Sequence, residues 1–402
     1  MNTFSSAKWL YTMTFFVVTV LLFSLAGTAF AQLNLVYVET NIGSVPNMNS
    51  VAGYSNDGLG NLTALPGSPF LTGGTGVFNA ASNSTAYDAE SEIIVKPDGS
   101  LLLAVNGHSN TVAVFTINSD GSLTPAAGSP FSSAGRDPVS LGLFSNVLSG
   151  NTSLLTVVNK NNDPNGNSGN PPPGYRNFRL SASGVMTPLV GTAVNLPSGA
   201  APSQAMPDLG AHIMFTDEFM GVPSTITARK MQKTGKLIQV GQVASPDGAV
   251  FLGTVLHPTQ NVIYAALPAT NAIAVLTFDS SGSLAVDSTV ADAGSVICWL
   301  AVNQAGTRLY TGNTLDGTVS VFDITIPTTP IEIQLFQLSG TSPHTSNVQV
   351  DPTGHFLYAL DFQTLHVLTI NQLDGTLSEV APPVALPMPA GEQALGIASV
   401  MK

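Results

Sequence analysis

The stretch Glu92–Leu123, EIIVKPDGSLLLAVNGHSNTVAVFTINSDGSL, predicts most of one antiparallel sheet. A first strand covers 92–96, and a Pro-Asp-Gly turn leads into a second strand over 101–106. A third strand over 111–118 alternates between two faces, with Val112, Val114 and Thr116 on one of them. The Asp-Gly-Ser-Leu sequence that follows turns the chain into a fourth strand. We therefore predict a four-stranded antiparallel sheet.

The second strand of this unit recurs along the chain with the period of a four-stranded propeller blade. It begins near Val36, Leu102, Leu154, Ile213, Ile263, Leu309 and Leu357. The glycine turn before the fourth strand recurs in six of the seven units, at Gly60, Gly121, Gly184, Gly235, Gly282 and Gly375. The sixth unit has the Pro-containing connection Ile326–Pro330 instead. The repeats predict an all-β fold, a seven-bladed β-propeller of four-stranded antiparallel blades.

The two ends of the repeat region predict how the ring closes. The first unit starts at its second strand, near Val36, and has no first strand before it. The C-terminal segment Ala394–Met401 has the apolar pattern of the missing strand. We expect this C-terminal strand to pair into blade one, which would leave no open sheet edge between the first and last blades.

The N-terminal segment has the pattern of a secretory signal peptide. Lys8 is followed by the apolar run Trp9–Leu25 and by Ala29-Phe30-Ala31, a cleavage sequence before Gln32. We expect residues 1–31 to be removed, and residues 32–402 to form a single propeller domain that is exported to the periplasm or the extracellular space. An uncleaved membrane anchor is the alternative.

Composition excludes several classes of partner. Without Lys8, 11 basic and 24 acidic residues remain, and no basic run is present. Nucleic acid and anionic membrane surfaces are therefore not expected partners, and no membrane contact is expected after cleavage. The single cysteine, Cys298, lies in an apolar run, so we expect a buried, unreactive thiol and no intrachain disulfide.

Two insertions mark one rim of the predicted ring. Residues 71–90 connect blades one and two, and residues 161–177 lie between the second and third strands of blade three. Both kinds of connection emerge on the same rim, which we expect to be the binding surface. Tolerated surface loops are the alternative. The second insertion contains one carboxylate, whereas a calcium loop needs several oxygen ligands, so no metal is expected.

The repeats resemble those of the lactonase-type seven-bladed propellers, the group that contains 6-phosphogluconolactonase and the muconate-lactonizing propeller enzyme. The resemblance rests on the Gly-x-Leu turns and on the blade ends Gly67–Phe70 and Gly128–Phe131, both GSPF. It implies a bacterial protein and lactone chemistry carried by a histidine, a carboxylate and arginines. Pro343-His344 resembles the Pro-His-x-His element of the group, with Ser346 at the second histidine position. Arg136 and Lys160 are the basic residues placed to bind an anionic substrate.

The rim residues also suggest a site without the family. His344, with Glu392 or Asp361, has the groups needed to activate water, so these three are the candidate catalytic residues. Three further rim residues are candidate substrate-binding groups. They are His108, Asp217 and Glu218. Each has a structural alternative: Asp361 and His108 as turn residues, and the two acids as a solvated pair.

Two functions follow from these observations. The first is an exported platform that binds a small molecule, such as a lactone or sugar derivative, or another exported protein. The second is a lactone hydrolase, a carboxylic ester hydrolase that opens a sugar or other lactone at the channel mouth in the manner of 6-phosphogluconolactonase. The sequence leaves open whether the protein is an enzyme. No cofactor is expected, and we expect a monomer.

Overall fold

The structure is a computed structural model that describes residues 1, 32–78, 88–166, 169–219, 223–340, 344–379 and 381–402. Residues 2–31 of the predicted signal peptide, with the predicted cleavage sequence, lie outside this set. Leu33–Lys402 form one compact unit. Within the residues that the structure describes, no helix combines the length and apolarity that a membrane span requires.

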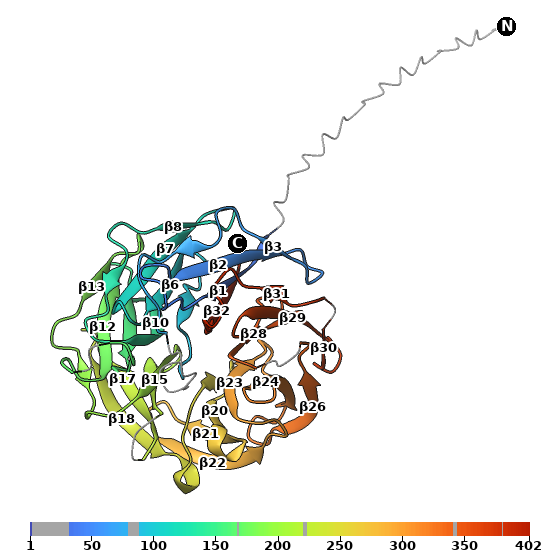
Figure 1. Ribbon diagram of the computed structural model, residues 1–402. Coiled ribbons are helices and arrows are strands. Elements are labelled where there is room, and N and C mark those ends of the chain that lie inside the picture. Colours follow the sequence, from blue (N-terminus) through green and yellow to red (C-terminus); the bar gives the residue numbers. More distant parts are fainter. Residues whose placement is uncertain (2–31, 79–87, 167–168, 220–222, 341–343, 380) are drawn as a thin grey trace. The chain divides into compact units, whose positions relative to one another are not determined.

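Seven sheets surround a central axis in the described part of this unit, and each is one blade with antiparallel strands a to d from the axis outward (Figure 1). The predicted seven-bladed propeller is confirmed. The innermost strands a, from blade one to blade seven, are β32 (Gly396–Met401), β5 (Ile93–Val95), β10 (Pro138–Leu148), β15 (Pro202–Asp208), β19 (Thr254–Leu256), β23 (Ile297–Val302) and β27 (Asn347–Val350). The strands b are β1 (Asn34–Glu39), β6 (Leu101–Asn106), β11 (Thr152–Asn159), β16 (Ile213–Glu218), β20 (Val262–Leu267), β24 (Arg308–Asn313) and β28 (Phe356–Asp361).

The outer half of each blade consists of strands c and d. The strands c are β2 (Ser50–Asn56), β7 (Thr111–Ile117), β12 (Gly174–Leu180), β17 (Thr225–Met231), β21 (Ala272–Phe278), β25 (Thr318–Asp323) and β29 (Thr364–Ile370). The strands d are β3 (Leu62–Ala64), β8 (Leu123–Pro125), β13 (Met186–Pro188), β18 (Leu237–Ala244), β22 (Leu284–Ala291), β26 (Ile331–Gln337) and β30 (Leu377–Glu379). Four blades carry a further two-residue strand on strand c: β4 (Phe70–Leu71), β9 (Phe131–Ser132), β14 (Val194–Asn195) and β31 (Val384–Ala385). Two short 3-10 turns are η2 (Pro246–Gly248) and η3 (Pro268–Thr270).

Strand alternation and turn glycines explain why the sequence adopts these blades. The predicted second strand of blade two coincides with β6, and the predicted third strand is one residue longer than β7. All six predicted turn glycines have positive φ, as the reversal between strands c and d requires. At Gly121 a Cβ atom would also lie 2.9 Å from a Leu35 side-chain carbon of the neighbouring blade. These turns therefore need glycine both for their backbone conformation and for blade packing.

The connections between strands fall on two rims. The a-to-b and c-to-d turns share one rim, here called the turn rim, and the b-to-c and d-to-a connections share the other, here called the loop rim. In blade three, strand β12 begins at Gly174, so the end of the predicted insertion 161–177 belongs to a strand.

The C-terminal strand closes the ring as predicted. β32 pairs antiparallel with β1, from Asn34 opposite Met401 to Glu39 opposite Gly396. Ile397, Ala398 and Val400 are buried where blade one meets its neighbours. The first blade thus contains strands from both ends of the propeller unit.

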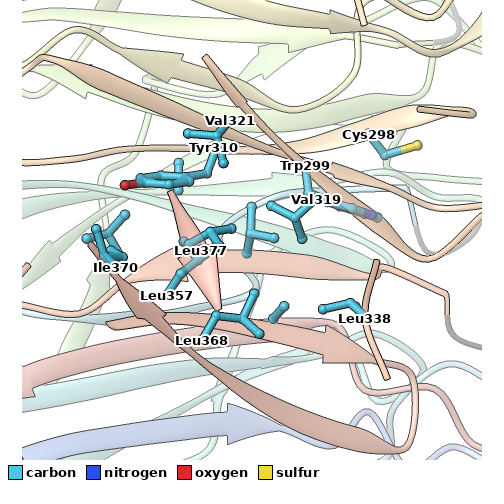
Figure 2. Close-up of a cluster of buried hydrophobic side chains, with 14 of the residues drawn as sticks. Cys298, Trp299, Tyr310, Val319, Val321, Leu338, Leu357, Leu368, Ile370 and Leu377 are labelled. Atoms are coloured by element: carbon cyan, nitrogen blue, oxygen red, sulfur yellow. The ribbon is translucent and has the colours of Figure 1, made fainter. Parts of the chain in front are cut away.

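Buried side chains between adjacent blades form the cores. Figure 2 shows one of them, between blades six and seven, where Trp299 and Tyr310 pack with leucines of blade seven, and where the predicted burial of Cys298 is confirmed. Burial raises the pKa of the Cys298 thiol to about 12. Buried tyrosines of strand b also join blades by hydrogen bonds, because the Tyr37 hydroxyl donates to Gly121 O of the next blade at 2.7 Å. The equivalent bonds are Tyr264 to Pro327 O at 2.8 Å and Tyr310 to Gly375 O at 3.1 Å.

Deleting residues 395–402 tests the contribution of ring closure to stability. The deletion removes β32 and exposes two blade faces, so we expect the free energy of unfolding to fall by about 4 kcal/mol or more. Urea denaturation followed by circular dichroism measures it. Leu373→Ser, at an exposed turn residue of blade seven, is the control and should change stability by less than about 0.5 kcal/mol. An unchanged urea midpoint in the deletion variant would contradict the proposed role of β32.

Candidate functional site

Parts of the two insertions meet on the loop rim. The Asn165 side-chain amide, in the blade-three insertion, donates to Phe78 O in the connection between blades one and two. The Lys160 ammonium donates to Asp88 O of the same connection at 2.6 Å. Residues 79–87 and 167–168 of these insertions lie outside the described residues. The contacts bring together segments of two different blades that are distant in the chain.

A polar pocket of about 210 Å³ lies beside these contacts. Its lining consists of two charged groups with opposite sign, a histidine, a buried acid and several amides. The lining residues are His108, Asn110, Arg136, Asp137, Asn161, Asp163, Asn165 and Gly166. They come from the b-to-c turn of blade two, the connection into blade three and the blade-three insertion. We call this cavity the rim pocket.

A histidine–aspartate pair is the main chemical feature of the rim pocket. His108 Nδ1 lies 2.7 Å from Asp163 Oδ2, and the His108 side chain is 41% exposed while that of Asp163 is 6% exposed. The backbone N–H of Asn165 donates to the other Asp163 oxygen at 2.8 Å and holds the carboxylate in place. Arg136 lines the same pocket, and its Nε donates to Asn170 O at 2.8 Å. The pair therefore leaves the imidazole partly exposed in a pocket that a guanidinium group also lines.

Asp137 is a buried acid in the wall of the rim pocket. Its backbone adopts φ 53°, and its N–H donates to Asn110 Oδ1 at 2.7 Å. One carboxylate oxygen accepts the Asn162 N–H at 3.2 Å, and the other has no hydrogen-bond partner among the described residues. Burial raises the pKa of Asp137 to about 7, with the charge of Lys160 opposing the shift and that of Asp163 adding to it. This carboxyl group can hold a proton at neutral pH.

Lys160, a candidate substrate-binding residue, points into the protein. The residue is 1% exposed. Its ammonium donates a hydrogen bond to Asp88 O and lies 5.7 Å from the centroid of the Phe219 ring. Burial lowers the pKa of Lys160, while the nearby carboxylates of Asp88, Asp137, Glu92 and Asp217 raise it. The side chain also borders a second loop-rim cavity of about 600 Å³, whose walls include Pro172 and Pro173. Lys160 is thus an internal counter-charge at the base of the loop rim.

Three buried carboxyl groups lie at the loop rim of blades one and two. Glu39 ends β1, and Glu90 and Glu92 belong to the connection that precedes β5. Burial raises the pKa of both Glu39 and Glu90 to about 8, and it raises that of Glu92 well above its usual range, with the neighbouring Glu90 adding to the shift. Neither side-chain oxygen of Glu92 has a hydrogen-bond partner within the part of the chain that the structure describes. Among the residues that the structure describes, no group of three or more His, Cys, Asp or Glu side chains is arranged to hold a metal ion. We interpret these groups as proton-bearing carboxyls.

The predicted pair Asp217–Glu218 lies in β16 of blade four and is largely buried, so it is not a solvated pair. Burial raises the pKa of Asp217 well above its usual range, and Ser203 and Lys160 lower it. Glu218 lies 3.4 Å from an Arg229 terminal nitrogen, and its pKa is raised by burial despite this partner. Glu218 therefore pairs with Arg229 inside blade four. Among the predicted substrate-binding residues, His108 and Arg136 line the rim pocket.

The three predicted catalytic residues lie where blades seven and one meet. The backbone N–H of His344 donates to Asp361 Oδ1 at 3.0 Å, and the His344 ring lies 5.4 Å from the Phe362 ring. Glu392 is 2% exposed and accepts the N–H groups of Gly43 at 3.1 Å and of Ser44 at 2.9 Å. Its carboxylate thus holds a loop of blade one. Pro343, which precedes His344 in the predicted motif, lies outside the described residues.

The fold and the rim pocket together define the class: a seven-bladed β-propeller with polar chemistry on its loop rim. Residues 216–392 match the sequence model of the family described as Lactonase, 7-bladed beta-propeller. The predicted resemblance to lactonase-type propellers is confirmed. The matched range includes His344, Asp361 and Glu392, whereas the rim pocket precedes it.

Solved structures with the same fold come from several bacteria. The periplasmic gluconolactonase of Pseudomonas aeruginosa is 14% identical, with a TM-score of 0.70, over 92% of this chain and 99% of that chain. A candidate 6-phosphogluconolactonase of Bacteroides fragilis is 15% identical, with a TM-score of 0.70, over 93% and 99%. A protein of Lactobacillus plantarum is 14% identical, with a TM-score of 0.68, over 92% and 100%. No curated protein sequence matches. At these identities the likeness establishes the fold.

The buried carboxyls predict how stability depends on pH. The pKa of Glu39 is about 8 in the folded protein against an ordinary value of 4.5, so between these pH values the folded protein binds more protons than the unfolded chain. Stability should therefore fall as the pH rises from 5 to 8. Glu39→Gln keeps an acceptor for the Asn49 amide, which donates to Glu39 at 2.6 Å. This variant should reduce the fall by at most about 4 kcal/mol.

Urea denaturation at several pH values between 5 and 8 measures this effect. Asp279→Asn is the control, because Asp279 is exposed and its pKa is lowered by hydrogen bonds from Ser281 and Ser283. Its pH profile should run parallel to that of the wild type. A wild-type stability that rises between pH 5 and pH 8 would contradict the assignment of protonated buried carboxyls.

Proposed function

We propose that the protein is a hydrolase of small lactones that acts at the rim pocket. The observation that carries the proposal is the His108 Nδ1 to Asp163 Oδ2 contact at 2.7 Å in a pocket that also holds Arg136 and Asp137. A base that can return its proton to the leaving group and a cationic donor for the developing oxyanion are the groups that ring opening of a lactone requires. The match of residues 216–392 to the lactonase family supports the same reaction class.

The reaction follows from the positions of these groups. With the proton on Nδ1 and bonded to Asp163, His108 Nε2 takes a proton from water, and the water oxygen attacks the lactone carbonyl carbon. Arg136 supplies donors for the oxygen that becomes negatively charged. The ring C–O bond then breaks, and the leaving oxygen receives the proton that His108 Nε2 took from water, so His108 acts first as the base and then as the acid. The product is a hydroxy acid.

The pocket lining favours a polar substrate. The side-chain amides of Asn110, Asn161 and Asn165 line a cavity of about 210 Å³, so hydroxyl groups on the lactone would find donors and acceptors. A small polyhydroxylated lactone fits this chemistry better than an aliphatic one. The adjacent cavity of about 600 Å³ is wide enough for a larger substituent.

Export is part of the proposal. Residues 1–31 have the pattern of a signal peptide, and one solved structure with the same fold is a periplasmic gluconolactonase. We infer that the protein works in the periplasm or outside the cell, on a lactone present there.

Hydrolysis of an aldonolactone panel, followed by proton release at neutral pH, tests the proposal. His108→Ala should lower kcat/KM by about 100-fold to 10,000-fold because it removes the base. Asp163→Asn should lower kcat more than it raises KM, whereas Arg136→Ala should also raise KM for anionic lactones. His355→Ala, at an exposed histidine of a turn in blade seven, is the matched control and should retain wild-type activity.

His344→Ala separates the two possible locations of the base. Activity that survives this substitution but not His108→Ala supports the rim pocket, whereas the reverse result assigns the base to the contact of blades seven and one. No turnover above the spontaneous rate in the wild type would overturn the hydrolase and favour the binding platform that composition and repeats also allow.

A further inference from the structure

The connection that enters blade two lies across one end of the central channel. The Glu90 N–H donates to Ser203 O in β15 at 3.3 Å, and a Glu90 side-chain oxygen accepts the Leu300 N–H of β23 at 3.4 Å. Ser91 O accepts the Leu141 N–H of β10 at 3.0 Å. The segment Asp88–Ser91 therefore contacts the inner strands of blades three, four and six from a position near the axis, on the loop-rim side.

The rest of the channel is a cavity of about 450 Å³. Its walls come from six of the seven inner strands: β32, β5, β15, β19, β23 and β27. Val95, Leu256 and Val302, the last residues of their strands, line it, so the cavity extends toward the turn rim. Among the described strands, each inner strand is paired on one side alone, and its free edge faces the axis with backbone donors and acceptors. The rim pocket and this cavity share none of their described lining residues.

Glu90 is the single ionisable group among the described residues that line this cavity. Aliphatic side chains such as Met206 and Val348 form part of the wall, and the described lining contains no lysine, arginine or histidine. The protein as a whole carries a formal net charge of -12. An anion in the channel would therefore lack a counter-charge, whereas a cation would meet a carboxyl group at the inner end.

We propose that the channel is a second ligand site that takes the ammonium group of a slender aliphatic amine, with Glu90 as its counter-ion and the strand edges around its chain. This site is separate from the proposed lactone chemistry, because its cavity extends toward the turn rim and shares no lining residue with the rim pocket. A primary ammonium has three donors, which match the Glu90 carboxylate and backbone carbonyls, and an aliphatic chain can lie against side chains such as Met206 and Val348.

The surroundings of Glu90 support a cation there. Burial raises the pKa of Glu90 to about 8, and the acidic Asp88 and Glu92 lie on the same connection. From β23 the Cys298 thiol faces the same region, and Lys160, which follows β11, is bonded to Asp88 O. An ammonium ion beside Glu90 would favour the ionised carboxylate, so binding at pH 7 should release part of a proton.

Calorimetry with hexylammonium and hexanoate, at equal ionic strength and with the purified protein, tests this site. Hexylammonium should bind, and hexanoate should bind at least about 10-fold more weakly, as expected for a carboxylate without a counter-charge. Glu90→Gln should weaken hexylammonium binding by at least about 10-fold. Glu332→Gln, on the outer strand β26, is the matched control and should leave the affinity unchanged.

A second variant, at Gln349 in the channel wall, tests the site without changing Glu90. Gln349→Trp reduces the volume of the cavity and leaves the Glu90 carboxyl group unchanged, so it should also weaken hexylammonium binding. This variant tests the channel site if Glu90→Gln does not fold. Lactone turnover should be the same in Gln349→Trp and wild type, so failure of the hydrolase and failure of this site are distinguishable. Equal affinities for the two probes, or an unchanged hexylammonium affinity in both channel variants, would overturn the proposal.

Discussion

The antiparallel pairing of β32 with β1 is the interaction on which the rest of the structure depends. A blade is a twisted sheet with two apolar faces, and each face is buried only when another blade lies beside it. With β32 in place, blade one packs against blade two on one side and blade seven on the other. The strand b tyrosines then tie neighbouring blades through hydroxyl contacts such as Tyr37 to Gly121 O. Closure therefore buries both faces of blade one and connects it to the rest of the ring.

Closure also creates the unusual electrostatics of the inner loop rim. When the d-to-a connections converge on the axis, the polar residues that start strands a lose their contact with water. Glu92 and Asp137, which precede β5 and β10, are carried inward in this way, and burial raises the pKa of each carboxyl group. Lys160 is the buried cation that faces them. The carboxyls therefore hold protons, because several like charges near one ammonium in a dry region would be unfavourable.

The candidate site could be predicted in part. His108 and Arg136 follow from the blade repeat, because the repeat determines which turns reach the loop rim. Asp163, the one carboxylate of the blade-three insertion, bears in the sequence on metal binding alone, and no motif marks Asp137. Both acids belong to blade three, far from His108 in the chain, and the b-to-c insertion has no repeat that predicts its path. A polar residue at the start of strand a, such as Asp137, is the signal that could have directed attention to it.

Glu392 illustrates the opposite case, since its contacts to Gly43 and Ser44 occupy a carboxylate that the sequence suggested for catalysis.

The sequence by itself determined the number of blades, their strand order, the glycine turns and the closing strand. These features depend on the alternation of side chains along each strand and on the repeat of the blade, both of which are visible in the sequence. The tertiary structure decided which polar residues face solvent and which face each other. The partners of His108, Lys160 and Glu90 are side chains or backbone groups from other blades, distant in the chain. Such pairs depend on how the insertions fold over the ring, which no local pattern records.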